Sequence, residues 1–336
     1  MKRLYFYKCL LLILFSLFSS ITVSAHQTNH FKTNVYFAEG CAENLTGSNK
    51  DNSSTVEKEK EKEKEIVRPK NSPLQDTQSA VSSETILHYL GNEAVLVEDK
   101  EVKFLFDPFF HNHYGQYILV PDAIRSKIFS GQAPFDNITA IFVSHVHGDH
   151  FDAKDTLRYL KANKDTLLFI PEQGRLQLQQ LSSYNEIEAQ VRSVELKLGD
   201  PAISFNLNNM DIDAVYIPHA GWPQRQDIQN TVFRISTPSN FTVAHFGDAD
   251  ANPTFYRQHH QHWKKKLTDV ALVPYWLALT PDGREVINSI INSKKNIGVH
   301  VPVKGHPALP GSWTDYFSRP GEQRAIKNHR ELPNEK

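Results

Sequence analysis

The segment 144–152 constrains this chain of 336 residues more than any other. It reads Ser-His-Val-His-Gly-Asp-His-Phe-Asp and follows directly on the apolar run 138–143. Imidazole and carboxylate groups together are the ligands of zinc and of other borderline divalent metals. A His-rich solvated loop is the alternative, but four such groups in so short a window favour a metal site. Its candidate ligands are His145, His147, Asp149 and His150.

Residues 1–25 have the pattern of a secretory signal peptide. Lys2 and Arg3 give a positive start, an apolar run covers 9–18, and small residues precede a cleavage site after Ala25. The apolar run is shorter than the ~20 residues that span a bilayer. We therefore expect an extracytoplasmic protein, periplasmic or secreted, without a stable membrane span after cleavage. An uncleaved membrane anchor is the alternative.

The next segment, 26–84, contains little that a core could bury. It is rich in Asn, Ser, Thr, Lys and Glu and includes an alternating Lys/Glu tract over 57–65. Such a composition predicts a disordered low-complexity linker, and a partner-binding arm is the alternative. Cys41 is the single cysteine left after signal cleavage, so no internal disulfide is expected.

Composition narrows the class of protein. The chain has 37 basic and 38 acidic residues, a formal net charge of -1, and 40% hydrophobic residues. These values fit a soluble globular protein. A balanced charge gives no attraction for nucleic acid, so we expect no nucleic-acid partner.

From residue 85 on, short apolar runs alternate with amphipathic stretches. The pattern predicts an α/β (α+β mixed) fold of two sheets flanked by helices, with a strand meander first and alternating units later. The expected strands are 85–89, 94–98, 102–106, 138–143, 166–170, 192–197, 202–207, 213–218, 232–236, 241–246, 270–273 and 297–301. The expected helices are 121–130, 153–164, 173–181, 253–262 and 284–291. Asp152 is the natural N-cap of the second helix, with Asp155 in its first turn.

Three further candidate ligands stand at the ends of apolar strands. His219 ends the run 214–218, Asp248 follows 241–247, and His300 ends 296–299. Adjacent strands bring such ends together at one sheet edge. His306 is the rival of His300, but it lies in a turn-like Val-Lys-Gly-His-Pro segment.

The order His-x-His-x-Asp-His, distal His, Gly-Asp and last His resembles the metallo-β-lactamase superfamily over residues 85–320. The openings Leu90-Gly91-Asn92-Glu93 and Phe106-Asp107-Pro108 look most like its lactonase-like and phospholipase-D-like branch. The resemblance implies a four-layer αβ/βα sandwich. The domain is expected over 85–325, with a C-terminal tail over 326–336.

The resemblance also implies roles for individual residues. It assigns His145, His147 and His219 to one metal and Asp149, His150 and His300 to a second. Asp248 would bridge the two, and Asp107 would orient a ligand imidazole. The cofactors would be two divalent ions, with zinc expected and manganese or iron suited to the same donors.

The implied activity is metal-dependent hydrolysis. Two ions would share a water and supply hydroxide at neutral pH, while Asp149 and Asp248 fix it and accept its proton. The expected substrate is an ester, lactone or phosphodiester of a small molecule or lipid headgroup. The region 85–336 contains no cysteine, which argues against β-lactamases with a cysteine ligand. A β-lactamase-like amidase and a non-catalytic metal-binding or sensor domain remain the alternatives.

Other polar and aromatic residues carry weaker signals. The pair His111 and His113 is interpreted as a solvated loop, and the group His259, His260 and His262 as an exposed helix end. Trp222, Tyr275 and Trp276 fit pocket walls and core packing equally well.

Overall fold

The structure is a computed structural model that describes residues 84–100, 102–306, 309 and 315–327. The predicted signal peptide, and the predicted linker up to residue 83, lie outside the described residues. All described residues belong to one compact unit, Gln75–Lys336. Among them, no helix has the length and apolar character needed to cross a membrane.

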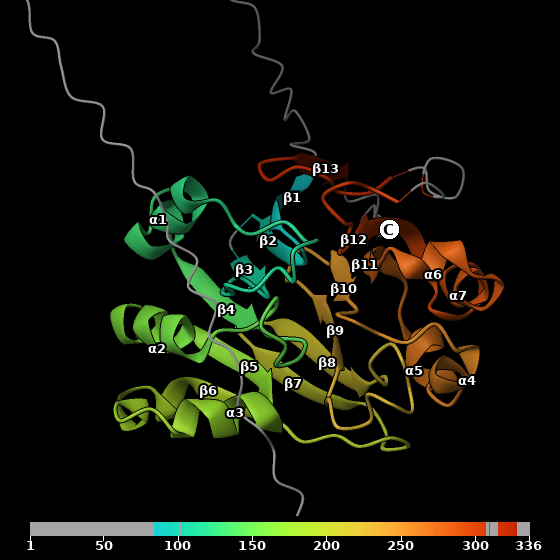
Figure 1. Cartoon of the computed structure of the whole chain (residues 1–336), viewed down its shortest axis with the longest axis horizontal. Coiled ribbons are helices and arrows are strands. Elements are labelled where there is room, and N and C mark those ends of the chain that lie inside the picture. Colours follow the sequence, from blue (N-terminus) through green and yellow to red (C-terminus); the bar gives the residue numbers. More distant parts are fainter. Residues whose placement is uncertain (1–83, 101, 307–308, 310–314, 328–336) are drawn as a thin grey trace, which may run out of the picture. The chain divides into compact units, whose positions relative to one another are not determined.

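Two β-sheets lie face to face in this unit (Figure 1). The first contains β1 (Glu84–Gly91), β2 (Ala94–Asp99), β3 (Val102–Phe106), β4 (Ile138–Phe142), β5 (Leu167–Pro171), β6 (Val191–Val194) and β13 (Gln323–Lys327). The second contains β7 (Ile203–Leu207), β8 (Met210–Tyr216), β9 (Thr231–Ser236), β10 (Thr242–His245), β11 (Thr268–Pro274) and β12 (Ser293–Val299). Within the described residues, the strand orders are β13-β1-β2-β3-β4-β5-β6 and β12-β11-β10-β9-β8-β7.

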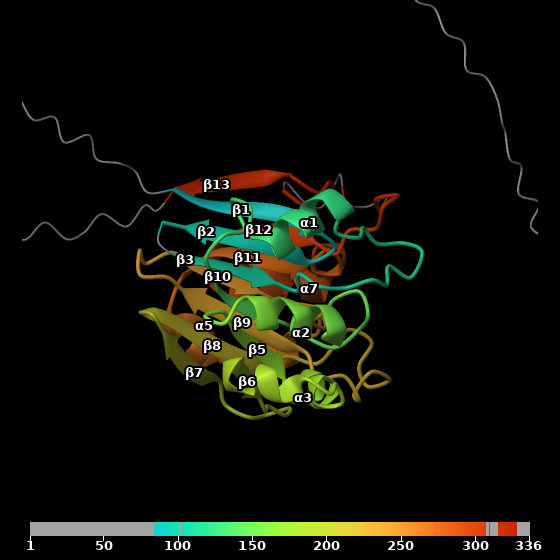
Figure 2. The same cartoon turned by 90° about the vertical axis from the view of Figure 1, so that its left-hand side faces the viewer.

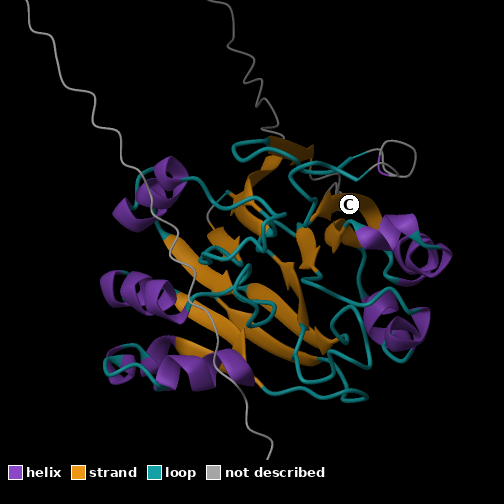
Figure 3. Ribbon diagram, viewed as in Figure 1, coloured by secondary structure: helices purple, strands orange, loops and turns teal. Residues whose placement is uncertain are grey.

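Helices cover the outer face of each sheet (Figure 3). The first sheet is covered by α1 (Asp122–Ser130), α2 (Ala153–Ala162) and α3 (Glu172–Gln179), which lie in front of it in Figure 2. Two short turns follow, η1 (Tyr184–Glu186) and η2 (Glu188–Gln190). The second sheet carries α4 (Pro253–Arg257), α5 (His260–Lys265), α6 (Trp276–Leu279), α7 (Pro281–Glu285) and η3 (Val286–Ile290). The layers are therefore helix, sheet, sheet, helix, which is the predicted sandwich.

Alternation along the strands explains these layers. In β11, Val270 and Leu272 pack into the core between the two sheets, whereas Ala271 and Val273 pack under the helices of the second sheet. Successive side chains of a strand point to opposite faces, so a strand that is apolar throughout is buried on both. Each buried valine or leucine of such a strand contributes ~1.5–3 kcal/mol to stability.

Most predicted elements are present, with shifts of a few residues at their ends. The predicted meander is the antiparallel hairpin series β1–β2–β3, and the alternating part begins with the parallel strands β3 to β6. The single helix predicted over 253–262 is wrong, because the chain forms two helices there, α4 and α5. The prediction also missed α6, which is only four residues long, and β13, an edge strand with alternate residues exposed.

Parallel pairing determines where the polar strand ends lie. The strands β3 to β6 run parallel in the first sheet, and β10, β11 and β12 run parallel in the second. Ligands of such sheets bind beyond the carboxyl ends of the strands. His145 follows β4, Asp248 follows β10 and His300 follows β12 directly, so each is on a connection at a carboxyl end.

Candidate metal centre

Three imidazoles and one carboxylate form the first cluster. The Nδ1 of His147 lies 3.1 Å from Nε2 of His145 and 3.0 Å from Nε2 of His219. The Oδ2 of Asp248 lies 3.1 Å from Nε2 of His219 and 3.8 Å from Nε2 of His145. Nitrogen ligands ~2.0–2.1 Å from a tetrahedral zinc ion are about 3.4 Å apart. These donor atoms therefore have nearly the mutual spacing that such an ion requires.

The second cluster lies on the other side of Asp248. The Oδ1 of Asp248 is 3.3 Å from Nε2 of His150 and 3.2 Å from Nε2 of His300. The Oδ2 of Asp149 is 3.3 Å from the same nitrogen of His300 and 3.7 Å from that of His150. One oxygen of Asp248 thus faces each cluster, which is the arrangement of a bridging carboxylate. Both clusters have the composition and spacing to hold metal ions.

Asp107 holds two of these imidazoles in place. Its Oδ2 accepts a hydrogen bond from Nδ1 of His150 at 2.8 Å and one from the hydroxyl of Ser144 at 2.6 Å. The Ser144 hydroxyl in turn lies 3.0 Å from Nδ1 of His145. A proton on each Nδ1 leaves Nε2 as the free lone pair for a metal. His219 is oriented in the same way, because its Nδ1 donates to the carbonyl of Ala220 at 2.7 Å.

Burial and mutual repulsion keep His145 and His147 of the first cluster unprotonated. Burial, and then the neighbouring His150, hold the pKa of His145 well below its ordinary value. Burial, and then His219, lower the pKa of His147 to about 4. For His150 burial is the largest single effect and acts in the same direction, but the carboxylates of Asp248, Asp107 and Asp149 together outweigh it and raise the pKa. For Asp248, burial is outweighed by His300 and His150, and its pKa is lowered. Neutral imidazoles and ionised carboxylates are the forms that bind metals, so His145, His147 and Asp248 are already in the binding form, whereas His150 would release a proton on binding a cation.

Several buried polar atoms of these clusters lack a hydrogen-bond partner within the described part of the chain. They are Oδ1 of Asp149, Oδ1 of Asp248, and both ring nitrogens of His300. A buried polar atom without a partner costs ~1–3 kcal/mol, and natural proteins seldom leave several together. A metal ion in the second cluster would satisfy Oδ1 of Asp248 and Nε2 of His300, so the residues present fit a divalent metal ion.

Backbone geometry supports a functional role for two of the residues. Asp107 and His300 have φ values of 40° and 60°. A residue with a side chain in this left-handed region is strained by ~1–3 kcal/mol, and such strain concentrates at functional sites. At both positions the strained backbone follows a strand directly and turns the side chain into the cluster.

Sequence reasoning missed a buried layer beneath the clusters. Glu93 is fully buried, and its carboxylate lies 3.3 Å from Nε2 of His245. Burial raises its pKa well above the ordinary value. The neighbouring Asn92 donates to the backbone carbonyl of Asp149 at 3.0 Å. The available signal was the polar pair Asn92 and Glu93 between the predicted strands 85–89 and 94–98.

The clusters open into a pocket of ≈ 490 Å³. Its wall includes Tyr117 and Trp276, whose rings meet the His300 ring edge-on at centroid distances of 4.0 and 5.2 Å. Arg225 also lines this pocket. Tyr117 borders a second, mainly apolar groove of ≈ 690 Å³ that includes Leu119 and Val303. The two cavities are therefore neighbours along the loop that contains Tyr117.

The remaining sequence candidates lie elsewhere. Asp152 caps α2 as predicted, since its Oδ1 accepts from the amide of Asp155 at 2.8 Å. His306 belongs to neither cluster, and its ring lies 5.6 Å from that of Tyr275. His111 is exposed, as predicted, and pairs with Asp155 at 3.1 Å. Trp222 packs edge-on against Phe255, at a centroid distance of 6.0 Å.

The interpretation of 259–262 as an exposed helix end is wrong for two of its three histidines. His259 is buried, and His262 is half-buried with its Nδ1 3.2 Å from the guanidinium of Arg234. Only His260 is exposed. Because α5 packs its Trp263 side into the core, the flanking imidazoles are covered as well.

Comparison with known proteins identifies the family of this fold. Residues 86–295 match the Beta-lactamase superfamily domain. The match covers more than half of the chain, so the protein belongs to the metallo-β-lactamase superfamily. A curated relative, a UPF0173 metal-dependent hydrolase of Alkaliphilus metalliredigens (strain QYMF), is 35% identical over 82 residues. The aligned stretch is 24% of this chain and 30% of that relative, so less than a third of the relative's length is matched.

Solved structures resemble the fold. An isothiocyanate hydrolase from Delia radicum gut bacteria has a TM-score of 0.50 and 14% identity, and the similarity covers 72% of this chain and 100% of that one. A metallo hydrolase from the archaeon Ignicoccus hospitalis has a TM-score of 0.48 and 15% identity, covering 73% and 100%. At such identities the likeness concerns the fold alone.

Proposed function

We propose that this protein is a dinuclear metal-dependent hydrolase that cleaves an ester, lactone or phosphodiester bond. The observation that carries the proposal is the position of Asp248. One of its oxygens faces His219 at 3.1 Å and the other faces His300 at 3.2 Å. A carboxylate shared by two donor clusters is suited to hold two cations close together and to position a water between them. Its presence favours a hydrolase over a domain that keeps one ion for stability.

The chemistry divides between the cofactors and the chain. Divalent ions bound at both clusters would lower the pKa of a water from ~15.7 toward ~7 and polarise the scissile bond. Asp149 and Asp248 would orient that water and accept its proton. Asp107 keeps the imidazole of His150 fixed, and Tyr117 with Trp276 screens His300 from solvent. Zinc is the expected metal, and manganese or iron suits the same nitrogen and oxygen donors.

The proposed substrate is a small molecule or a lipid headgroup, as in the lactonase-like and phospholipase-D-like branch. The apolar groove beside the metal pocket supports a substrate with an apolar part, because Tyr117 lines both cavities. The Alkaliphilus relative is described as a metal-dependent hydrolase, which supports hydrolysis as the reaction class. The signal-like pattern of residues 1–25 supports a periplasmic or secreted location.

The test compares His147→Ala with His306→Ala in the full chain. We expect the first to abolish hydrolysis and to lower the metal content, because it removes a donor that lies 3.0 and 3.1 Å from two others. The second should do neither, since His306 lies outside both clusters. Elemental analysis gives the metal content, and a panel of esters, lactones, bis-nitrophenyl phosphate and the β-lactam nitrocefin gives the activity.

Three outcomes would contradict the proposal. Hydrolysis of nitrocefin alone would indicate a β-lactamase-like amidase. Metal binding without turnover of any compound in the panel would indicate a metal-binding or sensor domain. Loss of activity in His306→Ala but not in His147→Ala would show that the site is assembled from other residues.

A further inference from the structure

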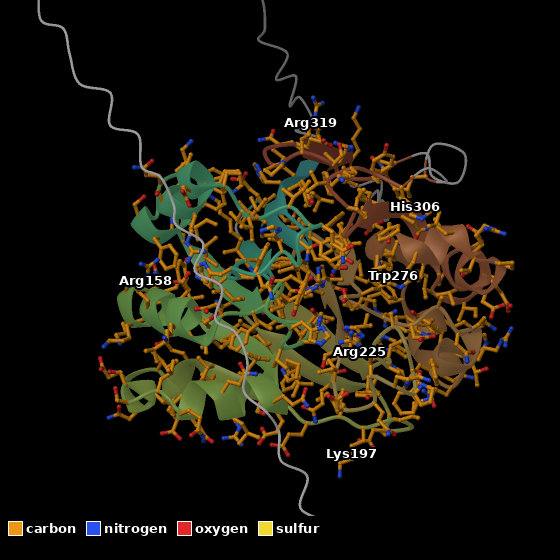
Figure 4. All side chains as sticks on the ribbon, in the orientation of Figure 1. Arg158, Lys197, Arg225, Trp276, His306 and Arg319 are labelled. Carbon is orange, nitrogen blue, oxygen red and sulfur yellow. The ribbon has the colours of Figure 1, made fainter. Side chains whose placement is uncertain are left out.

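The Nε2 atom of His147 lies next to an arginine side chain. The Nε2 of this imidazole lies 3.4 Å from Nη1 of Arg225, and both residues line the pocket over the metal clusters. Arg225 is exposed, and it makes no ion pair within the described part of the chain. Figure 4 labels it near the middle of the view, whereas Arg158, Lys197 and Arg319 lie at the periphery.

The position of Nδ1 in His147 determines whether Nε2 of the same ring is a hydrogen-bond donor. Nδ1 of His147 points toward the ring nitrogens of His145 and His219, so it is the atom that faces a metal ion. A neutral imidazole has one proton, and with its Nδ1 lone pair on a cation that proton is on Nε2. Nε2 is then a donor, and so is every nitrogen of the guanidinium. Two donors face each other across 3.4 Å with no acceptor between them.

The loop that contains Arg225 is tied to the metal centre. The amide of Ala220 donates to the carbonyl of Asp248 at 2.6 Å, and the amide of Gly221 donates to the side chain of Asp250 at 3.2 Å. The amide of Arg225 donates to the carbonyl of Gly221 at 3.3 Å. These bonds fix the backbone of the loop beside the clusters, so Arg225 extends its guanidinium from a defined position at the pocket.

We propose that Arg225, together with Nε2 of His147, binds an oxyanion of the substrate, a carboxylate or a phosphate next to the scissile bond. This inference rests on the proposed function and narrows its substrate class to anionic compounds. An arginine fork matches the two oxygens of a carboxylate or phosphate, and the imidazole proton adds a third donor. Among the described residues that line this pocket, Arg225 is the side chain with a permanent positive charge.

Kinetics on a matched pair of substrates tests the assignment. One is the 4-nitrophenyl monoester of glutarate, which carries a free carboxylate, and the other is its neutral methyl diester. In the metal-loaded full chain, Arg225→Ala should raise KM for the anionic ester about 10- to 100-fold, the effect of losing a charge-assisted hydrogen bond, and change the neutral one less than about 2-fold. Arg225→Lys should restore part of the difference. Arg319→Ala is the control, since that side chain is exposed at the periphery.

A binding measurement separates this inference from the proposed function. Calorimetric titration of inorganic phosphate and of glutarate into the metal-loaded protein should give weaker binding in Arg225→Ala than in the wild type. The anion that binds the wild type more tightly shows whether the site prefers a phosphate or a carboxylate. Anion binding that depends on Arg225, without hydrolysis of either ester or of any compound in the substrate panel above, supports the anion site and overturns the hydrolase. Hydrolysis of both esters with an unchanged KM ratio in Arg225→Ala, together with unchanged anion binding, overturns the anion site and leaves the hydrolase intact.

Discussion

Gly247 packs against both Ser144 and Asn230, and replacing it by alanine tests how closely these residues must approach it. It precedes Asp248 and has a φ of +53°. A Cβ atom at this position would lie 2.5 Å from Oδ1 of Asn230 and 2.5 Å from Cβ of Ser144. Asn230 accepts the amide of Asp248 at 3.1 Å, and Ser144 precedes His145. The added methyl would therefore push against groups that position both the carboxylate of Asp248 and the imidazole of His145.

Two costs add up in Gly247→Ala. A side chain in the left-handed region costs ~1–2 kcal/mol. Inserting a methyl group into a packed core costs ~1–3 kcal/mol more, because neighbours must move. We expect the free energy of unfolding to fall by ~2–5 kcal/mol in total. Relief of the clash displaces Ser144 or Asn230, so the metal affinity should fall as well.

Gly131→Ala is the matched control. Gly131 ends α1 with a φ of +63°, and no atom of the described residues lies within 4 Å of its would-be Cβ. It should therefore show the backbone cost alone, ~1–2 kcal/mol, and no loss of metal. Urea denaturation of the metal-free full chain measures stability, and elemental analysis after dialysis measures metal content. Equal destabilisation by the two substitutions, with metal retained in Gly247→Ala, would refute the reasoning.

Three further changes follow from single contacts. Asp107→Asn removes the charge that holds His150, and we expect a chelator competition assay to show ~10- to 100-fold weaker metal binding with an unchanged circular dichroism spectrum. Asp152→Ala should cost ~1 kcal/mol in thermal denaturation without loss of metal, because it removes only the cap of α2, so metal loss would show that Asp152 has a second role. Burial, and then Arg234, lower the pKa of His262 to about 3. Below its ordinary pKa of ~6.5 the unfolded chain therefore binds a proton that the folded chain does not, and stability should fall as the pH drops from about 6.5 to 3. His262→Gln should make the urea midpoint of the metal-free chain less dependent on pH in this window, and an unchanged pH dependence would contradict the assignment.

The sequence by itself identified the dense ligand segment and most strands. The spacing of His145, His147, Asp149 and His150 along one loop is local, and local patterns can be interpreted without a structure. Alternating and continuous apolar runs located the strands in the same way, since the period of a strand is visible within a few residues. Even the choice of His300 over His306 came from a local feature, the apolar strand that precedes it.

Only the tertiary structure decided which distant residues complete the site. His219 lies 72 residues from His147 along the chain, yet their nitrogens are 3.0 Å apart. Glu93 was missed because a lone acid in an apolar opening looks like a turn residue until the second sheet covers it with His245. Arg225 was missed because an arginine in a polar loop carries no signal. Its candidate role is visible only from its position beside the imidazole of His147. Contacts of this kind between distant segments are set by the packing of the whole fold and not by any local sequence pattern.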